Sequence, residues 1–422
     1  MKESFLHFLW RWRRFEATSL FTTDGQTLEI LHPGEWNKHA GPDFFNARVK
    51  IGNTLWAGNV ELHVKSSEWN NHRHSDDPAY DTVILHVVLE EDIPIYRSNR
   101  ERIPCLELAN RIPSGILSKY RRLEKQRSWI PCQNEYMQVP AIVRTGWHER
   151  MLVERLEEKT AHIARILEET NHDWQETFYR VLARSFGLKV NAEPFEMLAR
   201  SLSFKVIAKH KHQLSQIEAL LFGQAGMLNK EFKDKHPRIL AREYQFLRHK
   251  YKLTPMNESA WKFLRLRPAN FPSIRLAQFA VLLHNANNLL SNILETKDIK
   301  ELEKILDVQL GGYWLDHFVF DKESKASSKS LGRDYVHLLI INAVVPFIFY
   351  WGKVKKHDPF ENHALRLLEQ LPPESNSILR EWEAIGIKAE NSFQSQALIH
   401  LKTRFCDQKR CLECAVGNAI LK

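Results

Sequence analysis

The feature that most constrains the fold of this 422-residue chain is a change of hydrophobic period near Ile112. From residue 17 to about residue 110, apolar side chains alternate with polar ones or form short runs that end at turn residues, which is typical of β-strands. Beyond Ile112 they recur every three or four residues, as on the buried face of a helix. The sequence therefore predicts an α+β protein, in which a mixed β-sheet precedes a mainly α-helical region.

Turn signals divide the predicted sheet into strands. Asp24 and Gly25 join two short strands within residues 19–32, and Gly52 joins two longer ones within residues 45–65. Residues 81–92 hold a continuous apolar run, which predicts a central strand buried on both faces. The polar connection at residues 66–81 has room for a short helix.

These patterns predict three domains: an α/β domain over residues 1–135, a helical domain over residues 136–395, and a short cysteine-bearing tail over residues 396–422. At the N-terminus we expect a surface helix that docks four apolar side chains, Phe5, Leu6, Leu9 and Trp10.

Composition and charge narrow the class of partner. The net charge of +9 and the pI near 9.2 favour an acidic partner, nucleic acid before a membrane surface. The longest apolar run, residues 338–352, contains Asn342 and Pro346 and is shorter than the ~20 residues that span a bilayer, so we expect a buried helix. The N-terminus lacks the pattern of a secretory signal. We therefore expect a cytoplasmic protein that does not enter the membrane.

A row of charged side chains lies in the strand predicted at residues 58–65. Glu61, His63 and Lys65 share one face of this strand, because side chains alternate along it. Asp43 enters the preceding strand and can meet Glu61, since neighbouring strands are only ~4.8 Å apart. Two carboxylates this close repel each other unless they share a proton or a cation, and Mg²⁺ or Mn²⁺ accepts such ligands. A solvated outer face of the sheet is the simpler alternative.

This layout, Asp43 followed by Glu61, Leu62 and His63, resembles the PD-(D/E)xK nuclease superfamily. Over the N-terminal domain, the resemblance implies a restriction-endonuclease-like sheet, with Asp43 and Glu61 as metal ligands and the carbonyl of Leu62 completing the site. The usual lysine is replaced by His63, whose imidazole can act as a base or a ligand. Lys65 can supply the missing charge from the same face, so we expect these four side chains to be catalytic.

Further candidates surround this pair of carboxylates. The resemblance implies an assisting upstream acid, for which Glu35 is the candidate. His72, His74 and Asp77, in the polar connection, can line the rim of the same pocket and contact phosphate or a second metal. Their arrangement also resembles the metal-binding turn of metallo-β-lactamase-type hydrolases, which implies a zinc hydrolase as a lesser alternative. His86 lies in an apolar strand, and we expect it to be a hydrogen-bonded core histidine.

Three cysteines cluster near the C-terminus with Cys-x4-Cys-x2-Cys spacing: Cys406, Cys411 and Cys414. In a reducing compartment such clustering favours a metal over disulfides. Zinc and a four-iron cluster each need four ligands, so one more must come from elsewhere. Cys132 is the first candidate, with His400 as an alternative for zinc and Cys105 as a third. Reduced thiols without metal, or a redox switch, are the remaining interpretations.

In the helical domain, basic and aromatic residues interleave over residues 261–275. They can bind single strands by stacking, but packing between helices is the preferred interpretation.

Over nearly its whole length, the chain resembles one bacterial family of unknown function that is frequent in Bacteroidetes. The resemblance rests on residues 32–49, 58–88, 191–202, 217–226, 261–272 and 406–414, and it implies no activity.

Together these features predict a Mg²⁺- or Mn²⁺-dependent phosphodiesterase acting on DNA or RNA, with zinc or an iron–sulfur cluster as a structural clasp at the C-terminus. A non-catalytic nucleic-acid-binding or scaffold protein with a degenerate nuclease-like domain is the alternative.

Overall fold

The computed structural model describes residues 1–422 and divides them into two compact units. The first unit holds residues 1–147 and 401–422, and the second holds residues 148–400. The sequence-based boundaries fell at residues 135 and 395, with the tail as a part of its own. Residues 401–422 instead fold with the first unit, where the rings of Phe405 and Trp147 meet edge to face with 5.3 Å between their centres.

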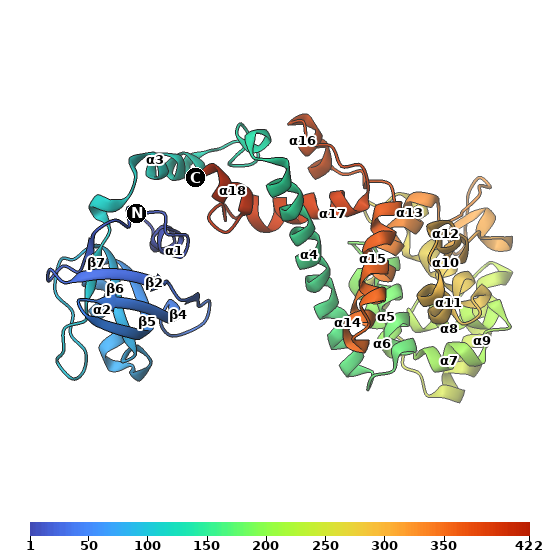
Figure 1. Cartoon of the computed structure of the whole chain (residues 1–422). Helices are drawn as coiled ribbons and strands as arrows, with labels where there is room; N and C mark the ends of the chain where they lie inside the picture. The colour runs from blue at the N-terminus through green and yellow to red at the C-terminus, as the bar shows by residue number, and fades with distance from the viewer. The chain divides into compact units, whose positions relative to one another are not determined.

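The first unit is built on one seven-stranded mixed sheet, whose strands are blue in Figure 1. The strands run in the order β1-β2-β4-β5-β6-β7, with β3 beside β4. Neighbours are antiparallel from β1 to β5, whereas β5, β6 and β7 are parallel. The strands are β1 Leu20–Phe21, β2 Thr27–His32, β3 Glu35–Trp36, β4 Phe44–Ile51, β5 Thr54–Lys65, β6 Val83–Glu90 and β7 Cys105–Glu107.

Local turn chemistry explains this sheet. Gly25 and Gly52 adopt positive φ angles of 87° and 57° at the two predicted hairpins, a region that glycine enters at little cost. β6 is buried along most of its length, as its continuous apolar run predicts. The predicted mixed sheet, both hairpins and the buried central strand are therefore confirmed.

The α-helices that lie wholly within the first unit are α1 Glu3–Arg11, α2 Glu68–Asn71, α3 Ser114–Lys125 and α18 Ala415–Ile420, of which α1 and α2 contact β5. α1 buries all four side chains expected to dock. The indole of Trp10 donates a hydrogen bond to the carbonyl of Pro33 at 2.9 Å, and the ring of Phe5 stacks on Tyr120 of α3 with centres 4.3 Å apart. α2 is the short helix expected in the polar connection.

The second unit is helical, with one two-stranded ribbon, β8 His317–Val319 and β9 Lys322–Glu323. Most of α4 Ala141–Glu169 belongs to it, and its other helices run from green to orange in Figure 1. These are α5 Trp174–Phe186, α6 Ala192–Ser201, α7 Phe204–Lys209, α8 Leu214–Gln224, α9 Lys235–Tyr251, α10 Pro272–Asn285, α11 Leu289–Glu295, α12 Ile299–Leu306, α13 Arg333–Leu339, α14 Val345–Lys355, α15 Asp358–Gln370, α16 Ser377–Ala384 and α17 Ser392–His400.

One helical stretch, Arg333–Lys355, is long and apolar enough to cross a membrane, and most of it is buried inside the protein. This is the buried helix that the apolar run at residues 338–352 predicts.

In the basic and aromatic segment near α10, Trp261 and Arg275 are buried, whereas Arg265 and Arg267 are exposed. The indole of Trp261 donates to the carbonyl of Ala225 at 2.9 Å. The guanidinium of Arg275 lies 3.5 Å from the ring centre of Tyr335 and donates to Gln278 at 2.8 Å. For these side chains, the packing interpretation is the one that the structure supports.

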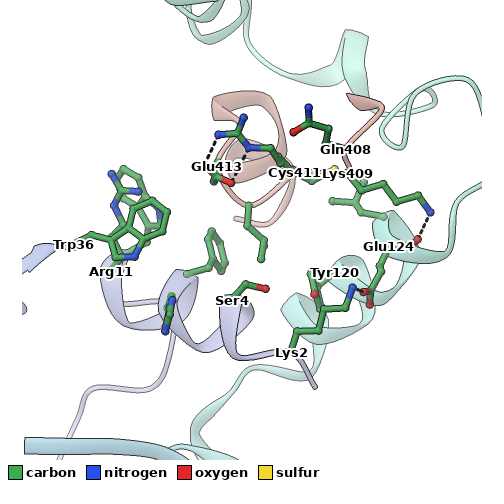
Figure 2. Close-up of a pocket in the computed structure, with 16 residues that line it drawn as sticks. Lys2, Ser4, Arg11, Trp36, Tyr120, Glu124, Gln408, Lys409, Cys411 and Glu413 are labelled. Atoms are coloured by element: carbon green, nitrogen blue, oxygen red, sulfur yellow. Dashed lines mark hydrogen bonds and ion pairs between the residues drawn. The ribbon is translucent and has the colours of Figure 1, made fainter. Parts of the chain in front are cut away.

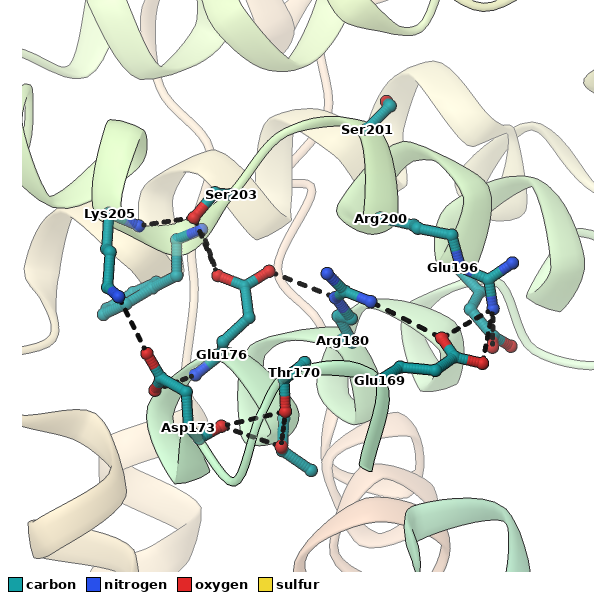
Figure 3. A network of polar contacts seen from close by, with 12 residues as sticks. Glu169, Thr170, Asp173, Glu176, Arg180, Glu196, Arg200, Ser201, Ser203 and Lys205 are labelled. Atoms are coloured by element: carbon teal, nitrogen blue, oxygen red, sulfur yellow. Dashed lines mark hydrogen bonds and ion pairs between the residues drawn. The ribbon is translucent and has the colours of Figure 1, made fainter. Parts of the chain in front are cut away.

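Figure 3 shows the polar network that ties the first helices of the second unit together. The buried carboxylate of Glu176 accepts hydrogen bonds from the hydroxyl of Ser203 at 2.9 Å, the backbone N–H of Phe204 at 2.8 Å and the guanidinium of Arg180 at 3.1 Å. Asp173 caps α5 by accepting from two backbone N–H groups. These hydrogen bonds satisfy the buried charge of Glu176, so we assign the network a structural role.

Candidate metal centre

Strand pairing brings Asp43 and Glu61 together. Phe44 of β4 lies opposite Val60 of β5, so the residues next to them, Asp43 and Glu61, become neighbours. The backbone N–H of Asp43 donates to Glu61 Oε2 at 3.0 Å, and the backbone N–H of Leu62 donates to Asp43 Oδ2 at 3.0 Å. Each carboxylate is therefore fixed by the strand that carries the other.

Helix α1 adds two ligand-type side chains that the sequence reasoning missed. His7 Nε2 lies 3.1 Å from Asp43 Oδ2 and 3.4 Å from Glu3 Oε1. The ligand atoms of these three residues all lie within 4.8 Å of one another. The available signal was the spacing of Glu3 and His7, four residues apart and hence on one face of a helix.

Histidines form the other side of the site. His63 Nδ1 is 2.9 Å from His86 Nε2, and His63 Nε2 is 3.2 Å from His72 Nδ1. His74 Nε2 is 3.3 Å from Glu61 Oε1. His86 is buried and hydrogen-bonded, as the sequence analysis expected.

The connection that carries His72 and His74 is anchored by Trp69. This indole is 1% exposed, and its Nε1–H donates to Ser75 Oγ at 3.0 Å. The ring of His74 stacks on Tyr80 with centres 3.8 Å apart. The segment is therefore held in one place, although its sequence shows no regular hydrophobic period.

Burial sets the electrostatics of the site. It raises the pKa of Glu61 to about 7, and together with the neighbouring His86 it lowers the pKa of His63 to about 2. Burial would also lower the pKa of His7, but the contacts with Asp43 and Glu3 prevail and raise it to about 9. His63 is therefore a neutral imidazole at physiological pH.

The burial and contacts of the predicted site residues test several of the expected roles. Glu61 and His63 are 5% and 1% exposed, so the solvated-face alternative is wrong. Lys65 is exposed at the end of β5. Glu35 is exposed on β3 opposite Phe45, and Asp77 uses Oδ1 to accept the backbone N–H of Ala79 at 2.9 Å.

A cavity of about 300 Å³ adjoins the site and shares His7 with it. Figure 2 shows its lining, which combines aromatic and basic side chains from α1, β3, α3 and the C-terminal segment. The guanidinium of Arg11 lies 4.7 Å from the ring centre of Trp36, and the ammonium of Lys38 lies at the same distance. Two acids, Glu124 and Glu413, also line it.

Cys132 and the three tail cysteines lie in one region of the first unit. Burial raises the pKa of the Cys132 thiol, and the nearby thiols of Cys414 and Cys411 raise it further. The pKa of Cys406 is raised by burial and then by the same three cysteines. The other two candidates for the fourth ligand are Cys105, which is on β7 beside Arg102, and His400, which ends α17 and belongs to the second unit.

The backbone around Cys411 and Cys414 is tight. A Cβ on Gly417 would come within 2.1 Å of the carbonyl oxygen of Cys411, so only glycine fits. Burial raises the pKa of Cys414 to about 11, while hydrogen bonds from the backbone N–H groups of Gly417 and Val416 act in the opposite direction. N–H groups aimed at a sulfur stabilise its thiolate form, which is the form that binds metal.

Comparison with known proteins identifies the family. A model described as "Protein of unknown function (DUF2851)" matches residues 3–377. The chain belongs to this family. No curated protein and no solved structure matches the chain. DUF2851 membership thus confirms the expected family of unknown function. Because the family has no assigned activity, any proposed activity rests on the site itself.

Proposed function

We propose that the first unit is a Mg²⁺- or Mn²⁺-dependent phosphodiesterase that acts on DNA or RNA. The observation that carries the proposal is the meeting of two anchored carboxylates, Asp43 and Glu61, in the middle of a sheet. This is the arrangement that the resemblance to PD-(D/E)xK nucleases implies.

The side chains at this place fit a hard divalent cation. Asp43, Glu61 and Glu3 offer carboxylate oxygens, and His7, which is protonated when it pairs with Asp43 and Glu3, would lose its proton to a cation bound between these acids. Mg²⁺ and Mn²⁺ prefer oxygen ligands and keep water in their remaining positions. A bound ion would supply Lewis-acid stabilisation of a phosphate group and help to activate water.

The protein's own contribution is to hold these acids before any ligand arrives. Backbone N–H groups donate to one oxygen of Asp43 and one of Glu61, so neither side chain has to be ordered at the moment of reaction. Glu3 replaces Glu35 as the assisting acid in this proposal, because Glu3 shares His7 with Asp43.

Nucleic acid is the proposed substrate because of the neighbouring cavity. Single strands bind to grooves that combine stacking surfaces with positive charge. The cavity offers Trp12 and Trp36 beside Arg11, and its lining also includes Lys409 and His7, which belongs to the site. The net charge of +9 favours the same class of partner.

The second candidate is a non-catalytic nucleic-acid-binding or scaffold protein, and one observation favours it. The position usually held by lysine is His63, which is buried and neutral, while the side chain of Lys65 is exposed. No fixed positive charge from this strand therefore faces the two carboxylates.

Metal-dependent cleavage separates the two candidates. We expect the full-length protein to cut plasmid or single-stranded DNA or RNA with Mg²⁺ or Mn²⁺, and to stop after chelation. Asp43→Ala and Glu61→Gln should each lower the rate by about 100-fold or more, because a catalytic metal supplies several kcal/mol.

Glu29→Gln is the matched control, since Glu29 is an exposed acid of the same sheet opposite Lys50. It should cut like the wild type. Binding of nucleic acid without cleavage, equal in wild type and Asp43→Ala, would assign the protein to the second class.

We also propose a structural metal, zinc or an iron–sulfur cluster, held by Cys132, Cys406, Cys411 and Cys414. Four thiolates suit either zinc or an iron–sulfur cluster, and structural zinc sites contribute on the order of 10 kcal/mol to folding. Elemental analysis and the visible absorption spectrum of anaerobically purified protein distinguish them. Unchanged metal content and melting temperature in Cys411→Ser would refute this clasp.

A further inference from the structure

The histidines beside the carboxylates form a group that the proposed function does not use. We propose that His63, His72 and His74, together with Glu61, bind a transition-metal ion of the zinc class at a second cation site that shares Glu61 with the first. This goes beyond the nucleolytic proposal and does not depend on cleavage activity.

The spacing of the ligand atoms carries the proposal. One nitrogen from each of the three histidines lies within 4.8 Å of the others. His63 Nε2 is 3.2 Å from His72 Nδ1, and Glu61 Oε1 is 3.3 Å from His74 Nε2 and 3.7 Å from His63 Nε2. Ligands placed tetrahedrally about 2.0 Å from zinc are about 3.3 Å apart. The three distances given are therefore close to those in a zinc shell, with Glu61 reaching the group on the side of His63 and His74.

A hydrogen-bond chain among the histidines is the alternative, but it leaves His74 unexplained. His74 is 9% exposed, and its Nε2 makes no hydrogen bond of good geometry, although it points to Glu61. A buried polar atom without a proper partner costs free energy unless something binds it. A cation between the two side chains would satisfy both.

The surroundings orient these ligands. His63 is fixed by its Nδ1 contact with His86 at 2.9 Å, which leaves Nε2 toward the group. Metal-binding histidines commonly hold their second nitrogen in this way. Arg73, between the other two histidines, adopts a left-handed φ of 58° that turns the chain. His72 is exposed, so an ion can enter from solvent.

The chemistry of the two sites differs. Imidazole nitrogens suit zinc, cobalt, nickel and iron, whereas the oxygen-rich group at Asp43 and Glu3 suits magnesium and manganese. Glu61 belongs to both, because its Oε2 accepts the Asp43 N–H while its Oε1 faces the histidines. We therefore expect that substitution of a ligand belonging to one site removes its ion and leaves the other ion bound.

Equilibrium dialysis of the full-length protein against Zn²⁺, with metal counted by elemental analysis, tests the proposal. We expect His72→Asn to bind one zinc fewer than the wild type, or to bind it more than about 100-fold more weakly, since even outer-shell partners change affinity by 10–100-fold. Because His72 is exposed, this change leaves the packed interior intact. His74→Asn should give the same loss.

His212→Ala, which removes an exposed histidine of the second unit, should keep full zinc content. Cys411→Ser should instead lose the metal held by the cysteines and keep the histidine-bound zinc, so the double variant with His72→Asn should lose both. Equal zinc content and affinity in wild type, His72→Asn and His74→Asn would overturn the proposal and leave only a hydrogen-bonded histidine chain.

Asp43→Ala keeps the two proposals apart. This variant should abolish cleavage but retain the histidine-bound zinc. If Asp43→Ala loses cleavage but keeps the zinc, both proposals are supported. If the wild type binds the zinc but does not cleave nucleic acid, only the nucleolytic proposal is refuted.

Discussion

The buried carboxyl of Glu218 gives a stability prediction for the helical unit. Glu218, on α8, is 4% exposed, and its Oε1 accepts a hydrogen bond from Trp314 Nε1 at 2.8 Å. Burial raises its pKa from 4.5 to about 7, against the opposite effect of that hydrogen bond. The folded protein thus holds this proton more tightly than the unfolded chain does. Stability therefore falls as pH rises from 4.5 to about 7, and the loss is complete above that range.

Glu218→Gln removes the charge and keeps an oxygen that can accept from Trp314. At about 1.4 kcal/mol per pH unit, the interval from 4.5 to about 7 corresponds to about 3 kcal/mol. The variant should be more stable than the wild type by about 3 kcal/mol near pH 8, and no more stable near pH 4. His236 Nε2 lies 3.6 Å from Glu218 Oε2, but burial lowers the pKa of His236, so it stays neutral near pH 8 and does not offset the effect.

Urea unfolding of the full-length chain, followed by far-UV circular dichroism at several pH values, measures this difference. Glu381→Gln is the control, because Glu381 is an exposed acid on α16 of the same unit. It should change stability by no more than about 0.5 kcal/mol at any pH. Equal unfolding free energies for wild type and Glu218→Gln near pH 8 would show that burial does not penalise this carboxylate, and the reasoning would be refuted.

Two further substitutions test the metal sites through the packing that supports them. Gly417→Ala would place a Cβ within 2.1 Å of the carbonyl oxygen of Cys411, so we expect elemental analysis to show loss of the cysteine-bound metal. Gly115→Ala is the control and should retain the metal, because nothing lies within 4 Å of a Cβ at that position. Trp69→Ala removes the ring that lies 5.3 Å from His74, so we expect a loss of roughly 3–5 kcal/mol in unfolding free energy and a weaker histidine-bound zinc. Retention of that zinc at wild-type affinity would show that Trp69 does not position the ligands.

Local features of the chain were enough to predict much of the first unit. The hairpin around Gly52 sets the register of β4 and β5 as far as Ala47, which lies opposite Gly58. Between Ala47 and Phe44 the register shifts by one residue, and this irregularity, not the turn, brings Asp43 beside Glu61. The continuous apolar run of β6 and the apolar face of α1 follow from period. Such inferences work because they involve residues that are adjacent in sequence or joined by a short turn.

The sequence by itself therefore determined the α+β order and the hairpins, whereas the register shift that pairs Asp43 with Glu61 appears only in the folded sheet. Only the tertiary structure decided that α1 brings Glu3 and His7 to Asp43, and that His74 turns inward beside Glu61. The physical reason is that period shows which face of an element is buried but not which partner covers it. A polar connection such as residues 66–81 has no period at all, so its place depends on long-range packing.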